Sequence, residues 1–292
     1  MPPHERILEN ATDAELAVAI EGNLHALFRA MSSLPGAELV QTPELGRHCA
    51  PPVNPMFKGV WGARLEPERV DEAIGEVVAW FRRRGAPFFF WWTGPTTRPA
   101  DLGARLAARG LISMEAQTAE LAPGLQATTA GAPCMVAELD ALNVDVLDAT
   151  PPGFAIEPVR DEPALREFAG VLVDAYAVPA FLSQAWVDAT LAFGVDRAPW
   201  RLYLGRLDGE PVATNLVFDG AGVSGVYAVG TVERARGQGI GGAITLAPLL
   251  EARDAGYRYA VLFSSAMGVG AYERIGFRRI DAWIDRYMWR TA

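Results

Sequence analysis

The sequence predicts a mixed α/β fold built from two related units, and three observations support this prediction. The second half of the chain alternates strand-like and helix-like segments in the order β-α-α-β-β-β-α-β-α-β-β. The first half contains a helix–strand–helix run with comparable spacing of glycines and apolar residues. A Pro151-Pro152-Gly153 break lies between the halves, immediately before a strand-like segment. We therefore expect one unit over residues 1–150 and a second over residues 151–292.

The segments of the second half follow from hydrophobic periodicity and from turn residues. An alternating run at 154–162 predicts a strand, and an apolar stripe predicts a helix at 163–178. Asp208-Gly209 between two strand-like runs is typical of a tight hairpin turn. Gly256 is expected to end the helix that follows a glycine-rich turn. The other expected segments are a helix at 181–193, strands at 221–232 and 257–265, a short helix at 268–276 and closing strands at 277–289.

The first half resembles a degenerate copy of part of this plan. A helix at 67–85, an apolar strand at 86–92 and a helix at 100–111 are expected there. The alignment of the two halves pairs Gly85 with Gly256, 87–92 with 259–264, and Gly110-Leu111 with Gly276-Phe277. On this alignment Leu106 occupies the place of Tyr272. Helix–strand–helix order is also common in unrelated α/β proteins, so both explanations stay open at this point.

Composition argues against several classes of protein. The formal net charge of −9 and the pI of about 5.0 argue against a general nucleic-acid binder. No apolar run is long enough to span a membrane, and the first residues lack the apolar core of a signal peptide, so we expect a cytoplasmic protein without membrane contact. Cys49 and Cys134 are expected to be reduced thiols. The three histidines have no metal-ligand spacing, so no metal is expected.

The segment Arg236-Gly237-Gln238-Gly239-Ile240-Gly241-Gly242 connects a predicted strand to a predicted helix. Glycines cost backbone entropy on folding, so this segment is either a flexible loop or a bare backbone that approaches another group closely. A glycine-rich turn that opens a helix presents unpaired N–H groups and the positive end of the helix dipole, which together form an anion site. The segment lacks the Gly-Lys-Ser/Thr of a P-loop, and its glycine spacing is wrong for a dinucleotide fingerprint.

The second half resembles the GCN5-related N-acetyltransferase (GNAT) superfamily over about Phe154 to Arg290. The family signature Arg/Gln-x-x-Gly-x-Gly/Ala is met by Arg236-x-x-Gly239-x-Gly241. A strand precedes it, a helix and an apolar strand follow it, and the Tyr-x-x-x-Gly-Phe ending of Tyr272 to Phe277 stands at the expected place. The first half resembles, more weakly, the degenerate N-terminal unit of tandem GNAT proteins.

The resemblance implies acetyl-CoA as co-substrate and no metal. Its pyrophosphate would lie on the amides of Gly237 to Gly242, and its pantetheine arm would pair with the backbone of Val229 and Thr231 where the fourth and fifth strands diverge at a bulge. The first unit lacks the turn, so it is not expected to bind the cofactor. The implied cofactor-binding residues are Val229, Gly230, Thr231, Arg236, Gly237, Gln238, Gly239, Ile240, Gly241, Gly242 and Ser265.

Tyr272 is the implied catalytic residue, carried over from the family tyrosine as the acid that protonates the departing thiolate. Its alternative role is packing with a satisfied hydroxyl. The chain departs from the family pattern at two positions. Ser265 stands where an asparagine is frequent, and Pro248 lies inside the helix after the turn, where it is expected to bend or shorten that helix.

The general base is not identified by the sequence. The acceptor amine must lose a proton before it attacks, since a lysine-like amine has a pKa of about 10.4. The polar residues near the predicted site are Glu233, Asp174 and Tyr176, and each either acts at the site or is an ordinary exposed side chain. The tryptophans Trp91 and Trp92 either reach the site from the first unit or pack in the core. Arg234 is either a surface residue or a contact for the 3′-phosphate of CoA.

The sequence therefore predicts an acetyl-CoA-dependent N-acetyltransferase that acts on a small-molecule amine, as a monomer or homodimer. One alternative is an acyltransferase with another acyl group or an oxygen acceptor. Another is a non-catalytic acetyl-CoA-binding sensor or interaction module, because fold alone does not settle function.

Overall fold

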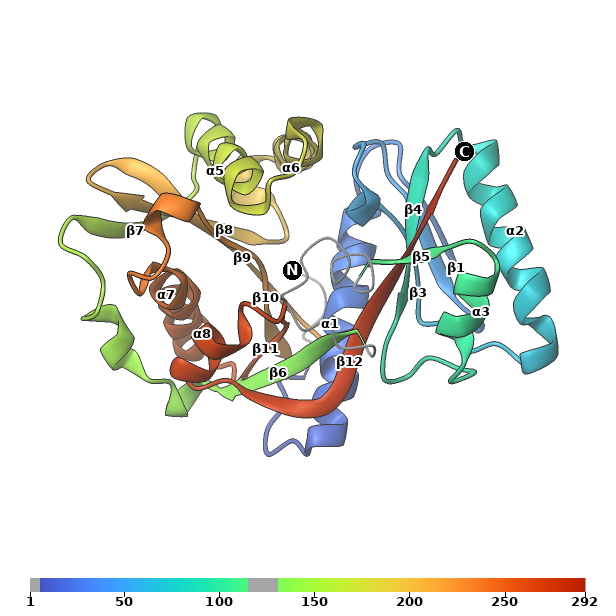
Figure 1. Cartoon of the computed structure of the whole chain (residues 1–292), viewed down its shortest axis with the longest axis horizontal. Coiled ribbons are helices and arrows are strands. Elements are labelled where there is room, and N and C mark those ends of the chain that lie inside the picture. The colour runs from blue at the N-terminus through green and yellow to red at the C-terminus, as the bar shows by residue number, and fades with distance from the viewer. Residues whose placement is uncertain (1–5, 115–130, 292) are drawn as a thin grey trace.

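Strands from both halves of the chain join in one twelve-stranded mixed sheet (Figure 1). The computed structural model describes residues 6–114 and 131–291. The strand order is β1-β2-β3-β4-β12-β6-β11-β10-β9-β8-β7, and β5 pairs with β12 beside this path. The elements of the first half are α1 (Asp13–Met31), β1 (Glu38–Gln41), β2 (Gly46–Cys49), β3 (Lys58–Trp61), α2 (Val70–Arg83), β4 (Phe88–Thr93), α3 (Leu102–Ala108), β5 (Ile112–Ser113) and β6 (Ala132–Glu138). Those of the second half are β7 (Phe154–Pro158), α5 (Glu162–Tyr176), α6 (Ala180–Phe193), β8 (Arg201–Leu207), β9 (Glu210–Gly220), β10 (Val223–Thr231), α7 (Ile240–Asp254), β11 (Tyr259–Phe263), α8 (Val269–Arg274) and β12 (Arg278–Arg290).

The second half confirms the predicted order of helices and strands from β7 to α8. β7 to β10 are antiparallel neighbours, and β11 lies parallel to β10. The helices α5 and α6 lie on one side of these strands, and α7 and α8 on the other (Figure 1). Asp208 and Gly209 have φ of 51° and 85°, as a type I′ hairpin turn requires. The closing segment forms one long strand, β12, where the sequence led us to expect separate strands.

The first half repeats part of this arrangement. β3 and β4 are parallel and are linked by α2, just as β10 and β11 are parallel and are linked by α7. The short helix α3 follows β4 as α8 follows β11. Leu106 lies in α3 and Tyr272 in α8, as the alignment of the halves predicts. The helix–strand–helix similarity is therefore a structural repeat.

Each half supplies one strand to the sheet region of the other. β6 precedes the Pro151 break in the sequence, yet it pairs with β11 on one side and β12 on the other. β12 pairs with β6 over its first part, where Ile284 lies opposite Ala132. Its last part lies between β4 and β5, where Arg286 lies opposite Trp92. The division near residue 150 stays a prediction, but strands cross it in both directions.

The long helix α1 lies between the two groups of strands and helices (Figure 1). Thr12 and Glu15 form a capping box at its start, a signal that is present in the sequence. Asn23 contacts the second half, because its Nδ2 donates a hydrogen bond of 3.0 Å to the carbonyl oxygen of Phe218. Glu21 contacts the first half, since its Oε2 accepts a hydrogen bond of 2.8 Å from the backbone N–H of Thr96. The polar side chains of α1 therefore bind both halves.

Pro248 lies inside α7 without ending the helix. A proline has no N–H, so the carbonyl of Ile244, four residues earlier, loses its helical donor. The side-chain amide of Asn215 on β9 donates to this carbonyl at 2.8 Å, and Asn215 is fully buried. The expected shortening of the helix is wrong, because a neighbouring strand supplies the missing hydrogen bond.

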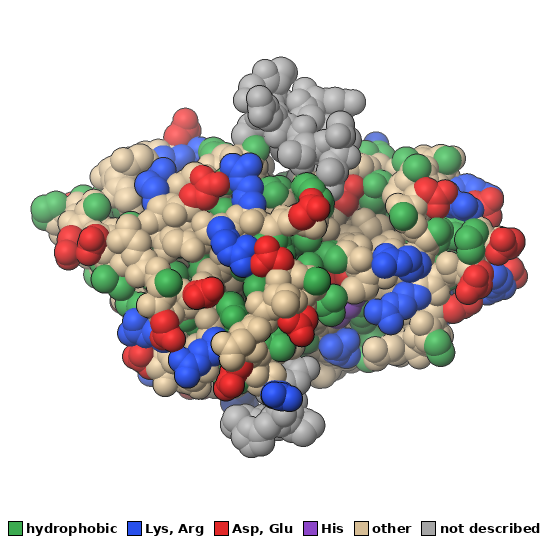
Figure 2. Space-filling model, turned by 90° about the horizontal axis from the view of Figure 1, so that it is seen from below, with side chains coloured by type: hydrophobic (Ala, Val, Ile, Leu, Met, Phe, Trp, Pro, Cys, Tyr) green, Lys and Arg blue, Asp and Glu red, His purple; other side chains and the backbone are tan. Residues whose placement is uncertain are grey.

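The surface carries side chains of both charges (Figure 2), and both cysteines are free thiols. On the face shown in Figure 2, basic and acidic side chains are interspersed. Cys49 and Cys134 are free thiols on β2 and β6. None of the helices in the described ranges is long and apolar enough to cross a membrane.

Replacing Asn215 by alanine should lower the free energy of unfolding by about 1–3 kcal/mol, because the buried Ile244 carbonyl is left without a donor. In a Pro248→Ala background the restored backbone N–H can reach that carbonyl, so Asn215→Ala should cost less. Urea unfolding of the four proteins, followed by tryptophan fluorescence, measures this coupling. An equal cost in both backgrounds would contradict the assignment.

Candidate active site

The glycine turn forms a run of unpaired amides at the start of α7. Gly237 and Gly239 have φ of 75° and 78°, a conformation that favours glycine. The N–H groups from Gly237 to Gly241 have no hydrogen-bond partner among the described residues. A side chain at Gly237 would meet open space, so the turn is accessible. These amides, together with the helix dipole, form a site for an anion.

The predicted cradle is one residue shorter than the sequence suggests. The amide of Gly242 donates to the carbonyl of Gly239 at 3.0 Å, so it is part of the helix. A Cβ at position 242 would lie 3.3 Å from Ile275, which explains a glycine there by packing. Ile240 is 1% exposed and its side chain belongs to the core, so only its amide is available to a ligand.

β10 and β11 diverge close to this turn. Their parallel pairing is limited to Ser224 with Ala260 and Gly225 with Val261, although β10 continues to Thr231. A bulge interrupts the pairing of β10 with β9 between Tyr227 and Gly230. The expected bulge and divergence of the two strands are therefore present.

The backbone of β10 beyond the bulge faces this gap at alternate residues. The N–H of Val232 donates to the carbonyl of Val212 on β9 at 3.0 Å, so Val232 faces β9. Successive residues of a strand direct their backbone groups to opposite edges, which places those of Thr231 and Val229 on the gap side. These are the two residues whose backbone the sequence assigns to the pantetheine arm.

Both gap-facing carbonyls already accept a side-chain hydrogen bond. The Tyr176 hydroxyl donates to the carbonyl of Val229 at 2.8 Å. The guanidinium of Arg236 donates to the carbonyl of Thr231 and to that of Ala175, each at 3.0 Å. Arg236 thus links the end of α5 to the end of β10, a role that the signature alone does not reveal. Each carbonyl oxygen has a second lone pair, so a ligand can still bind there.

Gly230 permits the close approach of α5 to this strand. A Cβ at position 230 would lie 2.9 Å from Cβ of Ala175 and 3.2 Å from the ring of Tyr176. The end of α5 therefore covers one face of the gap, and a larger residue at position 230 would push it away.

Tyr272 lies on α8, on the side of the sheet that also carries α7 (Figure 1). Its ring packs against Phe277, with centroids 5.8 Å apart. Its hydroxyl has no hydrogen-bond partner among the described residues, so the alternative of a satisfied packing tyrosine finds no support in them. Burial, with a smaller contribution from the phenol of Tyr176, raises the pKa of Tyr272 above the ordinary value of 10.0. The phenol is held in its protonated, donating form.

Solved structures share this arrangement across nearly the whole chain. A GCN5-related N-acetyltransferase from Kribbella flavida matches 96% of this chain and 95% of its own, with a TM-score of 0.64 and 19% identity. A functionally unknown conserved protein from Staphylococcus epidermidis matches 90% of this chain and all of its own, with a TM-score of 0.63 and 12% identity. A tandem GNAT protein from the clavulanic acid biosynthesis pathway matches 96% of this chain and 94% of its own, with a TM-score of 0.54 and 14% identity. The chain has the tandem GNAT fold. No protein-family model and no curated protein sequence matches it.

In terms of the GNAT fold, β10 and β11 are the diverging fourth and fifth strands, and α7 opens on the signature turn. Ser265 lies in the exposed segment after β11, and its hydroxyl makes no hydrogen bond within the described ranges. Gln238 is exposed, and its side chain donates to the carbonyl of Arg234 at 3.3 Å. Asp174 and Glu233 are exposed, on α5 and just after β10. The structure brings the turn, the gap and Tyr272 to one part of the GNAT fold, and it singles out no base.

Trp91 and Trp92 are both buried, as the packing alternative predicts. Trp92 nevertheless reaches the second half, since its ring centroid lies 6.1 Å from that of Phe263 on β11. Trp91 belongs to the core of the first half, with Phe81 and Phe89. The sequence could not distinguish these two neighbours, because only the sheet pairing decides which face each one occupies.

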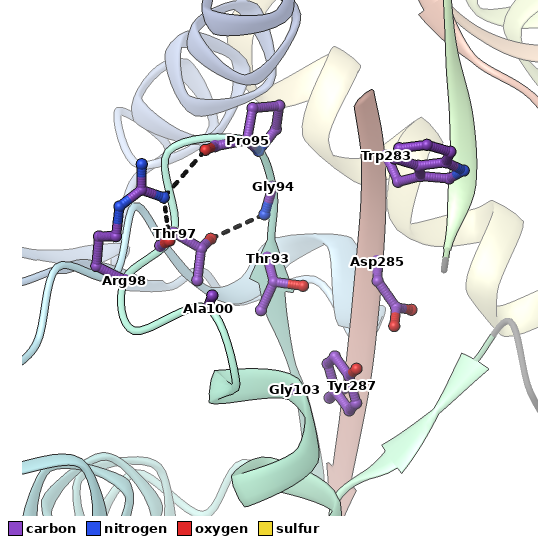
Figure 3. Close-up of a pocket in the computed structure, with 10 residues that line it drawn as sticks. All are labelled: Thr93, Gly94, Pro95, Thr97, Arg98, Ala100, Gly103, Trp283, Asp285 and Tyr287. Carbon is purple, nitrogen blue, oxygen red and sulfur yellow. Dashed lines mark hydrogen bonds between the residues drawn. The ribbon is translucent and has the colours of Figure 1, made fainter. Parts of the chain in front are cut away.

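A cavity of about 310 Å³ lies between the end of β4 and the start of α3 from the first half and β12 from the second half (Figure 3). Thr93, Asp285 and Tyr287 line it from the two strands (Figure 3). None of the residues predicted to bind the cofactor lines it. The cavity is therefore separate from the site on α7 and α8.

Titration with inorganic pyrophosphate should shift the backbone amide resonances of Gly237 to Gly241 in ¹⁵N–¹H spectra. Gly239→Ala should weaken this binding about five- to tenfold, because a φ of 78° is strained with a side chain and the new Cβ would lie 3.1 Å from the carbonyl of Ala149. Gly75→Ala, on an exposed part of α2 with no atom near its Cβ position, is the matched control and should bind as the wild type does. Shifts spread elsewhere, with the turn unaffected, would contradict the anion site.

Proposed function

We propose that this protein is an acetyl-CoA-dependent N-acetyltransferase that acts on the amine of a small molecule. The observation that carries the proposal is the run of unpaired amides from Gly237 to Gly241 beside the divergence of β10 and β11. An anion cradle and an extended backbone edge in this order suit a long ligand with a pyrophosphate at one end and a thioester arm at the other. The fold of the chain supports the same reading.

The residues of the site divide the work of an acyl transfer. The turn amides would hold the pyrophosphate of acetyl-CoA, and the backbone of Val229 and Thr231 would align the arm. Holding the thioester in one place lowers the entropy cost of the amine attack. The bound cofactor supplies an acetyl thioester, whose thiolate leaves as the amide bond forms. Tyr272 would donate its phenolic proton to that thiolate.

A raised pKa suits Tyr272 to this role. The raised pKa keeps the phenol neutral over the working pH range, and the neutral form is the one whose O–H can donate to the departing thiolate. The amine must arrive neutral or lose a proton to a base, and exposed Asp174 and Glu233 are the carboxylates nearest to the ends of α5 and β10 in sequence. The small-molecule acceptor, the acetyl group and the cytoplasmic location stay predictions.

The main alternative is a sensor that binds acetyl-CoA without turnover. It keeps its place because no carboxylate among the described residues is singled out as the base, since Asp174 and Glu233 are both exposed. The unpaired hydroxyl of Tyr272 favours the enzyme. An acyltransferase with another acyl group or an oxygen acceptor differs only in the pockets around the same turn.

Acetyl-CoA at about a hundredfold excess over its dissociation constant should raise the melting temperature by about 5 °C. Gly239→Glu should abolish the shift, because a carboxylate beside the turn amides repels the pyrophosphate. Gly75→Glu, with the same charge on the exposed face of α2, should keep it. If the wild type shows no shift, the cofactor assignment is wrong.

Tyr272→Phe should lower kcat in an amine-panel acetylation assay about 100-fold, while KM for acetyl-CoA changes less than about threefold. Since the pKa of Tyr272 is raised, the wild type should lose no activity through phenol ionisation up to about pH 10. The control is Tyr203→Phe, which removes a phenolic hydroxyl that lies away from the site and donates a hydrogen bond to Glu251. Full activity of Tyr272→Phe at every pH would overturn the acid assignment, and binding without turnover on any amine would favour the sensor.

A further inference from the structure

The divergence of β10 and β11 begins where α1 of the first half touches the strand. Gly225 is the last residue of β10 that pairs with β11. A Cβ at this position would lie 2.1 Å from Oδ1 of Asn23, so the side chain of Asn23 rests directly on the backbone of Gly225. A glycine is required at the branch point because a residue of the other half occupies the space above it.

Asn23 is fully buried and uses both ends of its amide. Its Nδ2 lies 2.9 Å from the carbonyl of Gly220 and 3.0 Å from that of Phe218, at the end of the β9–β10 hairpin. Its Oδ1 accepts a hydrogen bond of 2.6 Å from the hydroxyl of Tyr227. Tyr227 is the last residue of β10 before the bulge. One asparagine thus fixes both the branch point and the start of the bulge.

Tyr227 passes this constraint across the gap. Its ring packs edge to face against that of Phe263 on β11, with centroids 6.1 Å apart. One aromatic side chain from each of the diverging strands therefore contacts the other. Phe263 also packs against Trp92 of β4, again from the first half, with ring centroids 6.1 Å apart. Each ring of the pair therefore contacts a residue of the first half, Tyr227 through Asn23 and Phe263 through Trp92.

We propose that the first half holds the gap between β10 and β11 in its binding geometry, with Asn23 as the main positioning residue. As a statement about acetyl-CoA this rests on the proposed function. The tandem arrangement then has a reason beyond a second core: the unit without a cradle keeps the gap of the other unit open at the correct width. Asn23 touches no part of the turn and acts through Tyr227.

The test compares two variants of the full chain that each remove one buried hydrogen bond. Tyr227→Phe keeps the ring against Phe263 and removes only the bond to Asn23. Thr190→Val removes the buried acceptor of the Trp200 indole N–H, 3.1 Å away on α6, and is the control. Both should lower the melting temperature by similar amounts.

Hydrogen–deuterium exchange without ligand reads the gap itself. Tyr227→Phe should raise exchange about fivefold in peptides covering 224–232, and Thr190→Val should leave those peptides unchanged. Asn23→Ala should raise exchange less when it is made in the Tyr227→Phe variant than when it is made in the wild type, because the two residues act as a pair. Equal exchange in this segment for the wild type and Tyr227→Phe would overturn the proposal.

Acetyl-CoA titration reads the consequence. Tyr227→Phe should weaken binding about fivefold, and the control should bind within twofold of the wild type. Loss of affinity in both variants alike would make Tyr227 a stability residue and overturn its positioning role. If the wild type fails to bind acetyl-CoA, the proposed function fails, and the exchange experiment still decides whether the first half holds the gap.

Discussion

The exchange of β6 and β12 between the halves is the constraint on which the rest of this structure depends. β6 lies between β11 and β12, and the end of β12 lies between β4 and β5. Neither half therefore completes its part of the sheet with its own residues alone. Backbone hydrogen bonds across these pairs fix the relative position of the two units far more tightly than a side-chain interface would. α1 can then reach the branch point of β10 and β11 with a single asparagine.

The site is shaped by residues that have no side chain where another element comes close. Gly225 admits Asn23, Gly230 admits the end of α5, and Gly242 admits Ile275 of the segment after α8. A Cβ would collide with the neighbour at Gly225 and Gly230, and at Gly242 it would make a tight contact of 3.3 Å. The glycines of the turn differ from these, since Gly237 faces open space and its amide has no partner in the described chain. Glycine therefore serves packing in the strands and ligand access in the turn.

Most local elements could be predicted because their signals are local. The alternation of β7, the Asp208-Gly209 hairpin and the apolar stripe of α2 lie within short windows, and each was placed correctly. The helix α1 was overlooked although its Thr12–Glu15 capping box is visible in the sequence. Pro248 misled because its compensation, Asn215, comes from another strand.

The candidate site was predictable in its turn and not in its surroundings. The spacing from Arg236 to Gly241 predicts an anion site, yet only the fold shows that the Arg236 side chain donates to the carbonyls of Thr231 and Ala175. The partners of Val229 and Tyr227 are Tyr176 and Asn23, which lie far from them in the sequence. Packing of α5 and α1 against the sheet brings them together, and contacts over such separations have no signature in a single sequence.

The central claim is that one half carries the cofactor site and the other half has none. Isothermal titration of the full chain with acetyl-CoA tests this most directly, because it gives the number of sites as well as the affinity. We expect one molecule bound per chain and none bound by Gly239→Glu. Two molecules per chain, or binding that survives Gly239→Glu unchanged, would contradict the account.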